Sequence, residues 1–141
     1  MDKKVLISVR TVQVVDGQPE TVELVTEGKY YKKDSDYFAV YDETELSGME
    51  GTTTTLKMEQ DALSIIRRGT TSSNLFFKKD FNHVSMYNTP FGSLEISVKP
   101  SKVEINVGES GGKAQLEYKM QTAGLEPVSN SLEVSIREIL N

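Results

Sequence analysis

Strict alternation of apolar and polar residues constrains the fold of this chain more than any other feature. The clearest alternating apolar sets are Leu94/Ile96/Val98, Val103/Ile105/Val107, Leu116/Tyr118/Met120 and Leu132/Val134/Ile136. Successive side chains of a β-strand point to opposite faces, so each set marks a strand with one buried and one solvated face. Such one-sided burial is typical of antiparallel sheets. We therefore expect these apolar faces, Leu94 and Leu116 among them, to build a β-sheet core.

Turn residues separate the alternating segments at intervals that suit strands. The predicted strands span about residues 3–15, 20–33, 37–46, 52–59, 62–69, 72–79, 83–88, 92–107, 113–123 and 130–139. Their short connections favour sequential up-and-down pairing, and closing so many strands into a barrel removes exposed sheet edges. The 141 residues suit one domain, 1–141. The prediction is therefore all-β: a single closed up-and-down antiparallel barrel of about ten strands with little or no helix. A sandwich is the second choice.

Two strand registers stay open at this stage. If the turn at Asp34–Asp36 has three residues, Asp42 points into the barrel while Glu43 and Glu45 point out. A shift of one residue would reverse that assignment, because side chains alternate between faces. At 99–102, Pro100 accompanies a change in the parity of the apolar face, which indicates a bulge or corner. A hairpin turn there is the alternative.

Composition excludes several kinds of site. The chain has no Cys and one His, which excludes disulfides, thiolate zinc sites, iron–sulfur clusters, cysteine catalysis and multi-histidine metal sites. The single histidine, His83, shares a strand face with Ser85, but Ser85 lacks the sharp turn that presents a catalytic serine. We therefore expect no cofactor, no metal and no catalytic residue. Whether the protein is an enzyme is uncertain, and the sequence favours a non-enzymatic role.

Charge and hydropathy limit the partners of the protein. Its net charge of −5 opposes binding to nucleic acid. The apolar stretch Val5–Val9 near the N-terminus is too short for a secretory signal or a membrane span. We expect a cytoplasmic protein with no nucleic-acid or membrane partner. The sequence does not determine the oligomeric state.

Arg67 is the most informative single residue. A two-residue hairpin at 60–61 would pair Met58 with Leu63, Leu56 with Ile65 and Thr54 with Arg67. The two apolar pairs support this register, which directs Arg67 into the barrel beside Thr54 and Arg68 to solvent. An inward arginine needs a partner, and its planar guanidinium suits an anionic or polar group. The alternative is a structural role, with backbone carbonyls or a tyrosine ring as partners.

Tyrosines provide the other candidate ligand contacts. Tyr30 and Tyr118 lie on apolar faces, and Tyr87 shares the parity of His83. Aromatic rings with an occasional polar group would make an amphipathic pocket. The candidate ligand-binding residues are Arg67, Thr54, Tyr30, Tyr87, Tyr118 and Asp42. Alternatively, the rings fill the barrel and leave no cavity.

Four strings of the chain resemble the YwiB-like proteins, an uncharacterised bacterial family of unknown function. The strings are residues 26–31 (TEGKYY), 48–54 (GMEGTTT), 66–69 (IRRG) and 87–95 (YNTPFGSLE). The similarity runs from the first strand to the last. It implies a lipocalin-like, or calycin-like, closed β-barrel, and it implies no activity, cofactor or site residue.

Three hypotheses for function follow. The first is a non-enzymatic barrel that binds a small amphipathic or apolar ligand in its interior, with Arg67 and Thr54 holding a polar or anionic head. The second is a protein-interaction module with a filled barrel, and the third and weakest is a small hydrolase or isomerase. An interior void of at least about 300 Å³ would distinguish the first from the second.

Overall fold

A computed structural model describes residues 2–140 of the chain. The elements are β1 (Lys3–Val15), β2 (Gln18–Lys33), β3 (Asp36–Asp42), the 3₁₀ helix η1 (Glu45–Ser47), β4 (Thr52–Met58), β5 (Ala62–Gly69), β6 (Ser73–Lys78), β7 (His83–Thr89), β8 (Gly92–Gly108), β9 (Gly111–Thr122) and β10 (Val128–Glu138). All ten predicted strands are present. The third ends at Asp42, earlier than predicted, because Thr44 caps the 3₁₀ turn that follows it.

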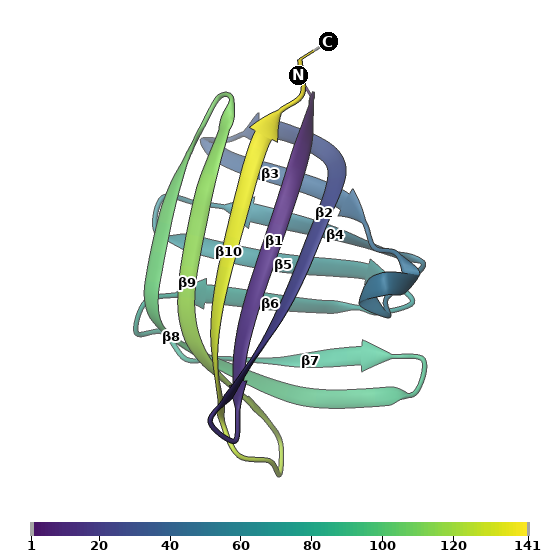
Figure 1. The fold of residues 1–141 in the computed structure, drawn as a ribbon, viewed down its shortest axis with the longest axis vertical. Helices are drawn as coiled ribbons and strands as arrows, with labels where there is room; N and C mark the ends of the chain where they lie inside the picture. Colours follow the sequence, from purple (N-terminus) through teal and green to yellow (C-terminus); the bar gives the residue numbers. More distant parts are fainter. Residues whose placement is uncertain (1, 141) are drawn as a thin grey trace.

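The strands form one antiparallel sheet in the order β6-β5-β4-β3-β2-β1-β10-β9-β8-β7 (Figure 1). Strands adjacent in the chain pair with each other, and β1 pairs with β10 as well as with β2. The sheet curls so that its end strands β6 and β7 approach, and a bridge between Ser72 and Asn88 joins the segments beside them. The prediction of an all-β up-and-down antiparallel barrel is confirmed, with the qualification that the barrel is nearly closed rather than fully hydrogen-bonded around its circumference. No helix within residues 2–140 has the length and apolar character needed to span a membrane.

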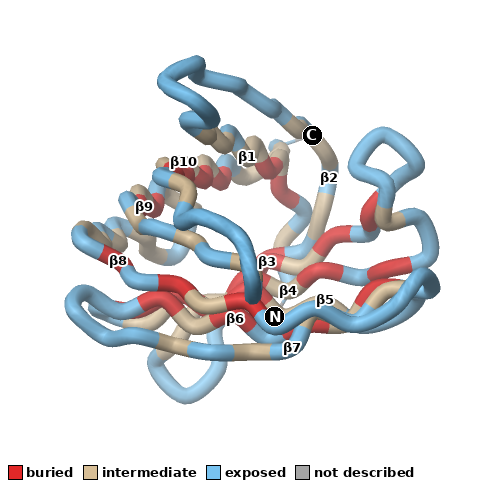
Figure 2. Tube along the Cα trace, turned by 90° about the horizontal axis from the view of Figure 1, so that it is seen from below, coloured by how far each residue is buried: buried red, intermediate tan, exposed pale blue. Residues whose placement is uncertain are grey.

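The core lies on the concave face of the sheet, and in strands such as β4 and β10 buried positions alternate with more exposed ones (Figure 2). It includes the predicted residues Ile96, Val98, Leu116, Leu132, Val134 and Ile136. Val103, Ile105, Tyr118 and Met120 pack against it and are partly buried. Leu94 is the exception: the prediction that it is a core residue is wrong, since half of its surface is exposed. It lies near the start of β8, beside the β7–β8 turn, where few side chains cover it.

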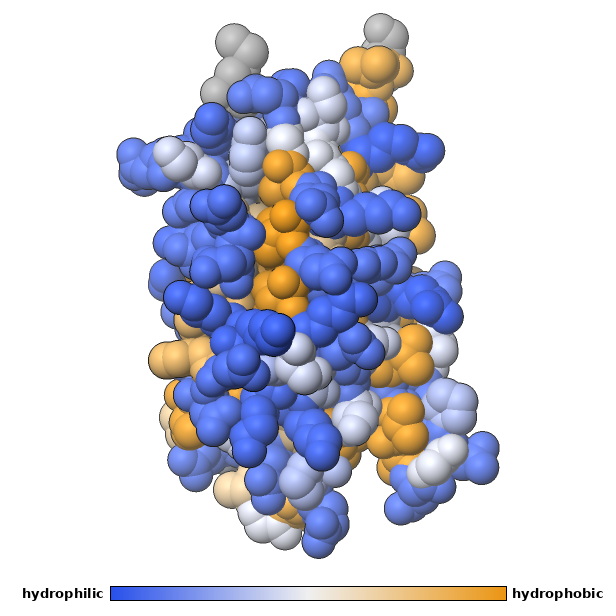
Figure 3. Space-filling model, turned by 90° about the vertical axis from the view of Figure 1, so that its left-hand side faces the viewer, coloured by the Kyte–Doolittle hydropathy of each residue, from blue (hydrophilic) through white to orange (hydrophobic). Residues whose placement is uncertain are grey.

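A β-bulge between Pro100 and Lys102 shifts the register of β8 against β9. The strand continues through it to Gly108, so the bulge interpretation is confirmed and the hairpin alternative is wrong. The extra residue keeps Val98 and Val103 on the same face of the sheet, opposite Met120 and Leu116 of β9. A space-filling view from the left-hand side of Figure 1, where β8 and β9 lie, shows a narrow apolar column on a mostly hydrophilic surface (Figure 3).

The turn between β2 and β3 decides which acidic residue faces the interior. Lys33 pairs with Asp36, so the loop contains two residues and not three. Asp34 and Ser35 both have positive φ, 52° and 75°, as the favoured two-residue hairpin turns require. The register therefore differs by one residue from the one that directs Asp42 inward. The structure thus has the second of the two registers left open by the sequence: the candidate ligand residue Asp42 is exposed and does not point into the barrel, and Glu43 is the buried carboxylate.

Gly28 marks the point where β2 and β3 diverge. The two strands pair from Lys33/Asp36 to Lys29/Val40. A Cβ atom on Gly28 would lie 2.5 Å from the carbonyl oxygen of Val40 and 2.5 Å from Cδ1 of Ile7. Glycine therefore lets the backbone of β2 pass close to β3 before it follows β1 around the barrel.

Candidate functional site

The barrel surrounds a cavity of about 410 Å³ that is partly open to solvent. Its lining comes from every strand except β2 and is mostly apolar and aromatic. Leu56, Ile65, Phe77 and Leu132 are typical of its walls. Among the residues that the structure places around it, Arg67 is the single charged one. The interior is thus a mostly apolar chamber with one charged hydrogen-bond donor, Arg67, and a few neutral polar groups such as the side-chain amides of Gln13 and Asn130.

The β4–β5 register places Arg67 as predicted. Thr54 lies opposite Arg67, and Leu56 lies opposite Ile65. Arg67 lines the cavity with 17% of its side chain exposed, whereas Arg68 is exposed on the outer face. The predicted orientation of both arginines is confirmed.

Glu43 accompanies Arg67 in the interior. Oε2 of Glu43 lies 3.9 Å from Nε of Arg67, and 2% of the Glu43 side chain is exposed. The hydroxyl of Thr54 donates a hydrogen bond of 2.5 Å to the same Oε2. The Arg67 Nε is buried and has no hydrogen-bond partner within residues 2–140. The two side chains form a loosely spaced buried ion pair. Its carboxylate accepts a hydrogen bond from Thr54, whereas its arginine Nε–H has no acceptor within residues 2–140.

The sequence analysis missed Glu43. The run Asp42–Glu45 signals acidic residues near the end of β3, but it does not show which of them faces inward. The signal that could have identified Glu43 is the alternative register at the β2–β3 turn. In that register the face that carries Tyr41 and Glu43 points into the barrel.

Two tyrosines beside the ion pair have raised pKa values. Burial raises the pKa of Tyr118 to about 12, against an opposing effect of the Arg67 charge. Burial also raises the pKa of Tyr41, and the Glu43 charge adds to the effect. Both hydroxyls stay neutral in the physiological range. The Tyr118 hydroxyl can therefore offer a hydrogen bond to a ligand but no charge.

Alkaline titration should show the burial of Tyr118. Its pKa rises from an ordinary value of 10.0 to about 12 on folding, so its contribution to stability is fully present below pH 10 and is lost as the pH rises through about 12. We expect Tyr118→Phe to make the loss of stability between these pH values less steep. Urea melts across this range, with tyrosinate absorbance recorded in parallel, provide the measurement. An unchanged slope would contradict the assignment.

The remaining predicted site residues lie in different places. Tyr87 lines the cavity, and its hydroxyl donates to Sδ of Met49 at 3.3 Å. Tyr30 is buried elsewhere in the core, where its hydroxyl donates to the carbonyl of Gly108 at 2.7 Å and its ring stacks on Tyr37. Asp42 accepts a hydrogen bond from Thr53 on the outer face.

The structure therefore divides the six candidates. Arg67, Tyr87 and Tyr118 line the cavity. Thr54 does not line it, and its hydroxyl donates a hydrogen bond to Glu43. Tyr30 and Asp42 are outside the residues that line this cavity.

His83 and Ser85, which share a face of β7, each contact a backbone carbonyl. Nε2 of His83 lies 3.1 Å from the carbonyl oxygen of Asn74, and the ring packs edge-on against Phe76. The hydroxyl of Ser85 is directed to the carbonyl of Met86. Within residues 2–140, no group of three or more His, Asp or Glu side chains is arranged to hold a metal ion.

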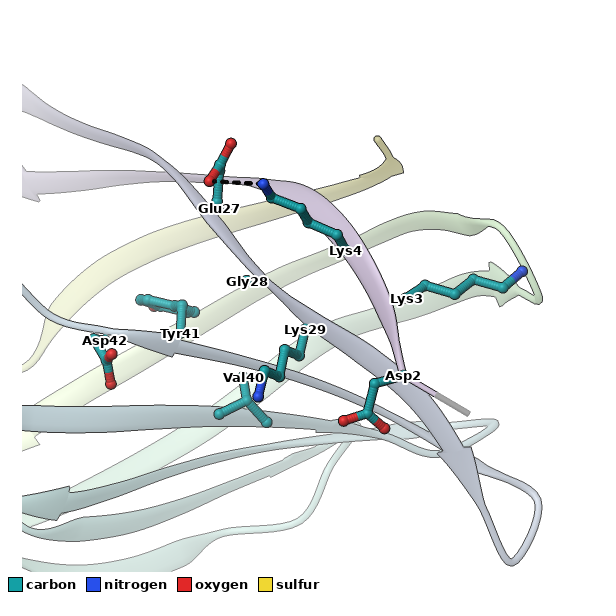
Figure 4. Close-up of a pocket in the computed structure, with 9 residues that line it drawn as sticks. All are labelled: Asp2, Lys3, Lys4, Glu27, Gly28, Lys29, Val40, Tyr41 and Asp42. Atoms are coloured by element: carbon teal, nitrogen blue, oxygen red, sulfur yellow. Dashed lines mark ion pairs between the residues drawn. The ribbon is translucent and has the colours of Figure 1, made fainter. Parts of the chain in front are cut away.

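A second pocket, of about 540 Å³, lies where β2 and β3 diverge at Gly28 (Figure 4). Six of the nine residues that line it are charged, and one pair of them, Lys4 and Glu27, forms an ion pair at 3.6 Å. Tyr41 borders both this pocket and the interior cavity. The outer pocket is larger than the interior cavity, but most of the residues that line it are charged, whereas the interior lining is mostly apolar.

Comparison with known proteins identifies the family. The model of a domain of unknown function, DUF1934, matches residues 7–134. The chain belongs to this family. It is 26% identical over 117 residues to an uncharacterised β-barrel protein, YwiB, of Bacillus subtilis (strain 168), and the match covers 82% of this chain and 80% of that protein.

A solved structure supports the same conclusion about the fold. The crystal structure of the ywiB protein from Bacillus subtilis superposes with a TM-score of 0.87 at 21% sequence identity. The match covers 99% of this chain and 94% of that one. The predicted resemblance to the YwiB-like family is confirmed, and the names of these relatives assign no activity.

Proposed function

We propose that this protein is a non-enzymatic binding protein that holds a small amphipathic or apolar molecule inside its barrel. The observation that carries the proposal is the interior cavity of about 410 Å³. Ligand pockets have volumes of about 300–1,000 Å³ and are lined mostly by apolar and aromatic side chains with a few polar groups. The cavity meets both criteria.

The distribution of polar groups suggests how a ligand would be oriented. Arg67 is the charged residue of the lining, and the neutral hydroxyl of Tyr118 belongs to the same cavity. A ligand with one polar end could direct that end to Arg67 and lay its apolar part against Leu56, Ile65 and Leu132. The same mode of binding is expected of a lipocalin-like barrel, the architecture that the resemblance implies.

A protein-interaction role is the second candidate. It is favoured by two almost fully exposed apolar side chains, Leu46 in η1 and Phe91 in the β7–β8 turn. The form of this hypothesis that needs a filled barrel is less well supported, because the interior has room for a ligand. Hydrolase or isomerase activity has the least support, since His83 and Ser85 both bond to backbone carbonyls.

A matched pair of tryptophan variants tests the binding role. Leu94 lines the cavity, whereas its neighbour Glu95 is exposed on the outer face. Leu94→Trp should fill part of the cavity and weaken binding of the neutral apolar dye Nile red by about tenfold or more, a loss of about 1.4 kcal/mol in binding free energy. Glu95→Trp should bind the dye like the natural protein. Dye fluorescence titrations measure both.

Native mass spectrometry of protein purified without denaturation complements the dye. A retained small molecule would identify the natural ligand class, and we expect Leu94→Trp to retain less of it than Glu95→Trp. If Nile red binds neither the natural protein nor Glu95→Trp, the proposal of an interior binding site is wrong.

A further inference from the structure

We infer that the polar end of the cavity selects an uncharged hydrogen-bond acceptor, such as the carbonyl of an amide or ester, over a free carboxylate. The inference rests on the proposed function, and it identifies the class of ligand. Glu43 is its basis: this buried carboxylate lies against Arg67 and outside the residues that contact the cavity. Arg67 alone would predict an anionic ligand.

Glu43 cancels most of the electrostatic attraction that Arg67 would exert on an anion. Oε2 of Glu43 is 3.9 Å from Nε of Arg67, and 2% of the glutamate side chain is exposed to solvent. Coulomb interactions weaken only inversely with distance and are poorly screened in a buried site. An anion that contacts Arg67 would therefore be repelled by Glu43 from only slightly farther away. The pair as a whole offers almost no net charge.

Hydrogen bonds hold Glu43 in place and oppose its movement away from an incoming anion. The hydroxyl of Thr54 donates to Oε2 of Glu43, and the backbone N–H of Glu43 donates to the carbonyl of Thr52 at 2.8 Å. Thr54 is itself fully buried on β4. The carboxylate thus stays beside Arg67 whether or not a ligand is present.

The arginine can still donate hydrogen bonds. A guanidinium carries five N–H donors, and the Nε of Arg67 is buried next to Glu43. Because Arg67 lines the cavity and its Nε is buried, we infer that its Nη groups are the donors that a ligand would reach. These donors suit a carbonyl oxygen well.

Desolvation strengthens the preference. Transfer of an ionised carboxylate into an apolar chamber costs far more free energy than transfer of an amide or ester, unless a full counter-charge compensates. The other residues that the structure places around the cavity supply no second positive charge, and the Tyr118 hydroxyl is neutral. A neutral acceptor gains the arginine hydrogen bond and loses less hydration.

The test compares ligands that differ in head group alone. A medium-chain saturated fatty acid, its primary amide and its methyl ester compete with bound Nile red, at a pH well above the pKa of the acid. For the natural protein we expect the amide and the ester to displace the dye at concentrations at least about tenfold lower than the acid.

Glu43→Gln removes the charge and keeps the shape of the side chain. In this variant we expect the acid to bind about tenfold more tightly, while affinity for the amide changes by less than about twofold. Asp42→Asn is the matched control, because Asp42 is the adjacent carboxylate on the outer face, and it should alter neither ligand. If Glu43→Gln fails to fold, the comparison of the acid with the amide and the ester in the natural protein still tests the inference.

The outcomes separate the two proposals. If the acid binds the natural protein as tightly as the amide, or if none of the three ligands displaces the dye, the inference about the head group is wrong while interior binding stands. If the dye itself does not bind, the proposed function fails, and the inference fails with it.

Discussion

Leu116→Ala should lower the free energy of unfolding by about 2–5 kcal/mol, the usual cost of deleting a buried leucine side chain. Leu116 lies at the centre of β9 with 1% of its surface exposed. It stands opposite Val103 of β8 on one side and Leu132 of β10 on the other. The backbone hydrogen bonds of the sheet hold both neighbours in place, so they cannot move in to fill the space that the substitution leaves. The variant should therefore lose most of the free energy that an unfilled cavity costs.

Urea melts of Leu116→Ala and of a control variant provide the measurement. Leu125→Ala makes the same chemical change in the β9–β10 turn, where 63% of the leucine is exposed. Its effect should stay within about 0.5 kcal/mol, as is usual for surface substitutions. A loss below about 1 kcal/mol for Leu116→Ala would show that the inner face of β9 is assigned incorrectly.

Parts of the architecture follow from the sequence because several independent patterns agree. In the β4–β5 hairpin, the apolar pair Leu56–Ile65 fits the same register that directs Arg67 inward. In β8, the change in parity between Val98 and Val103 could be explained by a bulge, and the strand contains one. In both places the burial of apolar side chains on one face determines the pairing.

The acidic end of β3 could not be predicted, and the reason is physical. A two-residue turn at 34–35 needs positive φ at Asp34 and Ser35, and neither is a glycine. Without that turn signal, both loop lengths remain compatible with the apolar pattern. The inward residue, Glu43, is charged, so alternation of hydrophobicity does not reveal it.

Two further features could not be predicted from the sequence pattern: the exposure of Leu94 and the way β6 approaches β7. Leu94 has the alternation of a core residue, but it lies beside the β7–β8 turn, where few neighbours cover it. The approach of β6 to β7 depends on how far the sheet curls, since residues 72 and 88 join there by a bridge and not by a full strand ladder. Alternation indicates which face of a strand is buried, and it does not indicate the curvature of the sheet.

Arg67→Met should also be strongly destabilising, by about 3 kcal/mol, the lower end of the range for breaking a buried ion pair. The methionine would fit the space, but it would leave the Glu43 carboxylate buried with the Thr54 hydroxyl as its hydrogen-bond partner. The cost lies at the lower end because Nε of Arg67 has no hydrogen bond to lose and the side chain is partly exposed. Arg68→Met, on the outer face, should change stability by no more than about 0.5 kcal/mol.

A double-mutant cycle shows whether Glu43 is the cause. If the loss comes from an uncompensated carboxylate, Arg67→Met combined with Glu43→Gln should be more stable than Arg67→Met alone by about 1 kcal/mol or more, since residues in direct contact are not additive. If the double variant is as unstable as the sum of the single variants, the pair is not coupled, and Arg67 stabilises the barrel by packing alone. If Arg67→Met is instead as stable as the natural protein, the arginine is an unfavourable charge in the empty cavity. Its presence would then be explained by a ligand, and weaker binding of the amide by this variant would support that explanation.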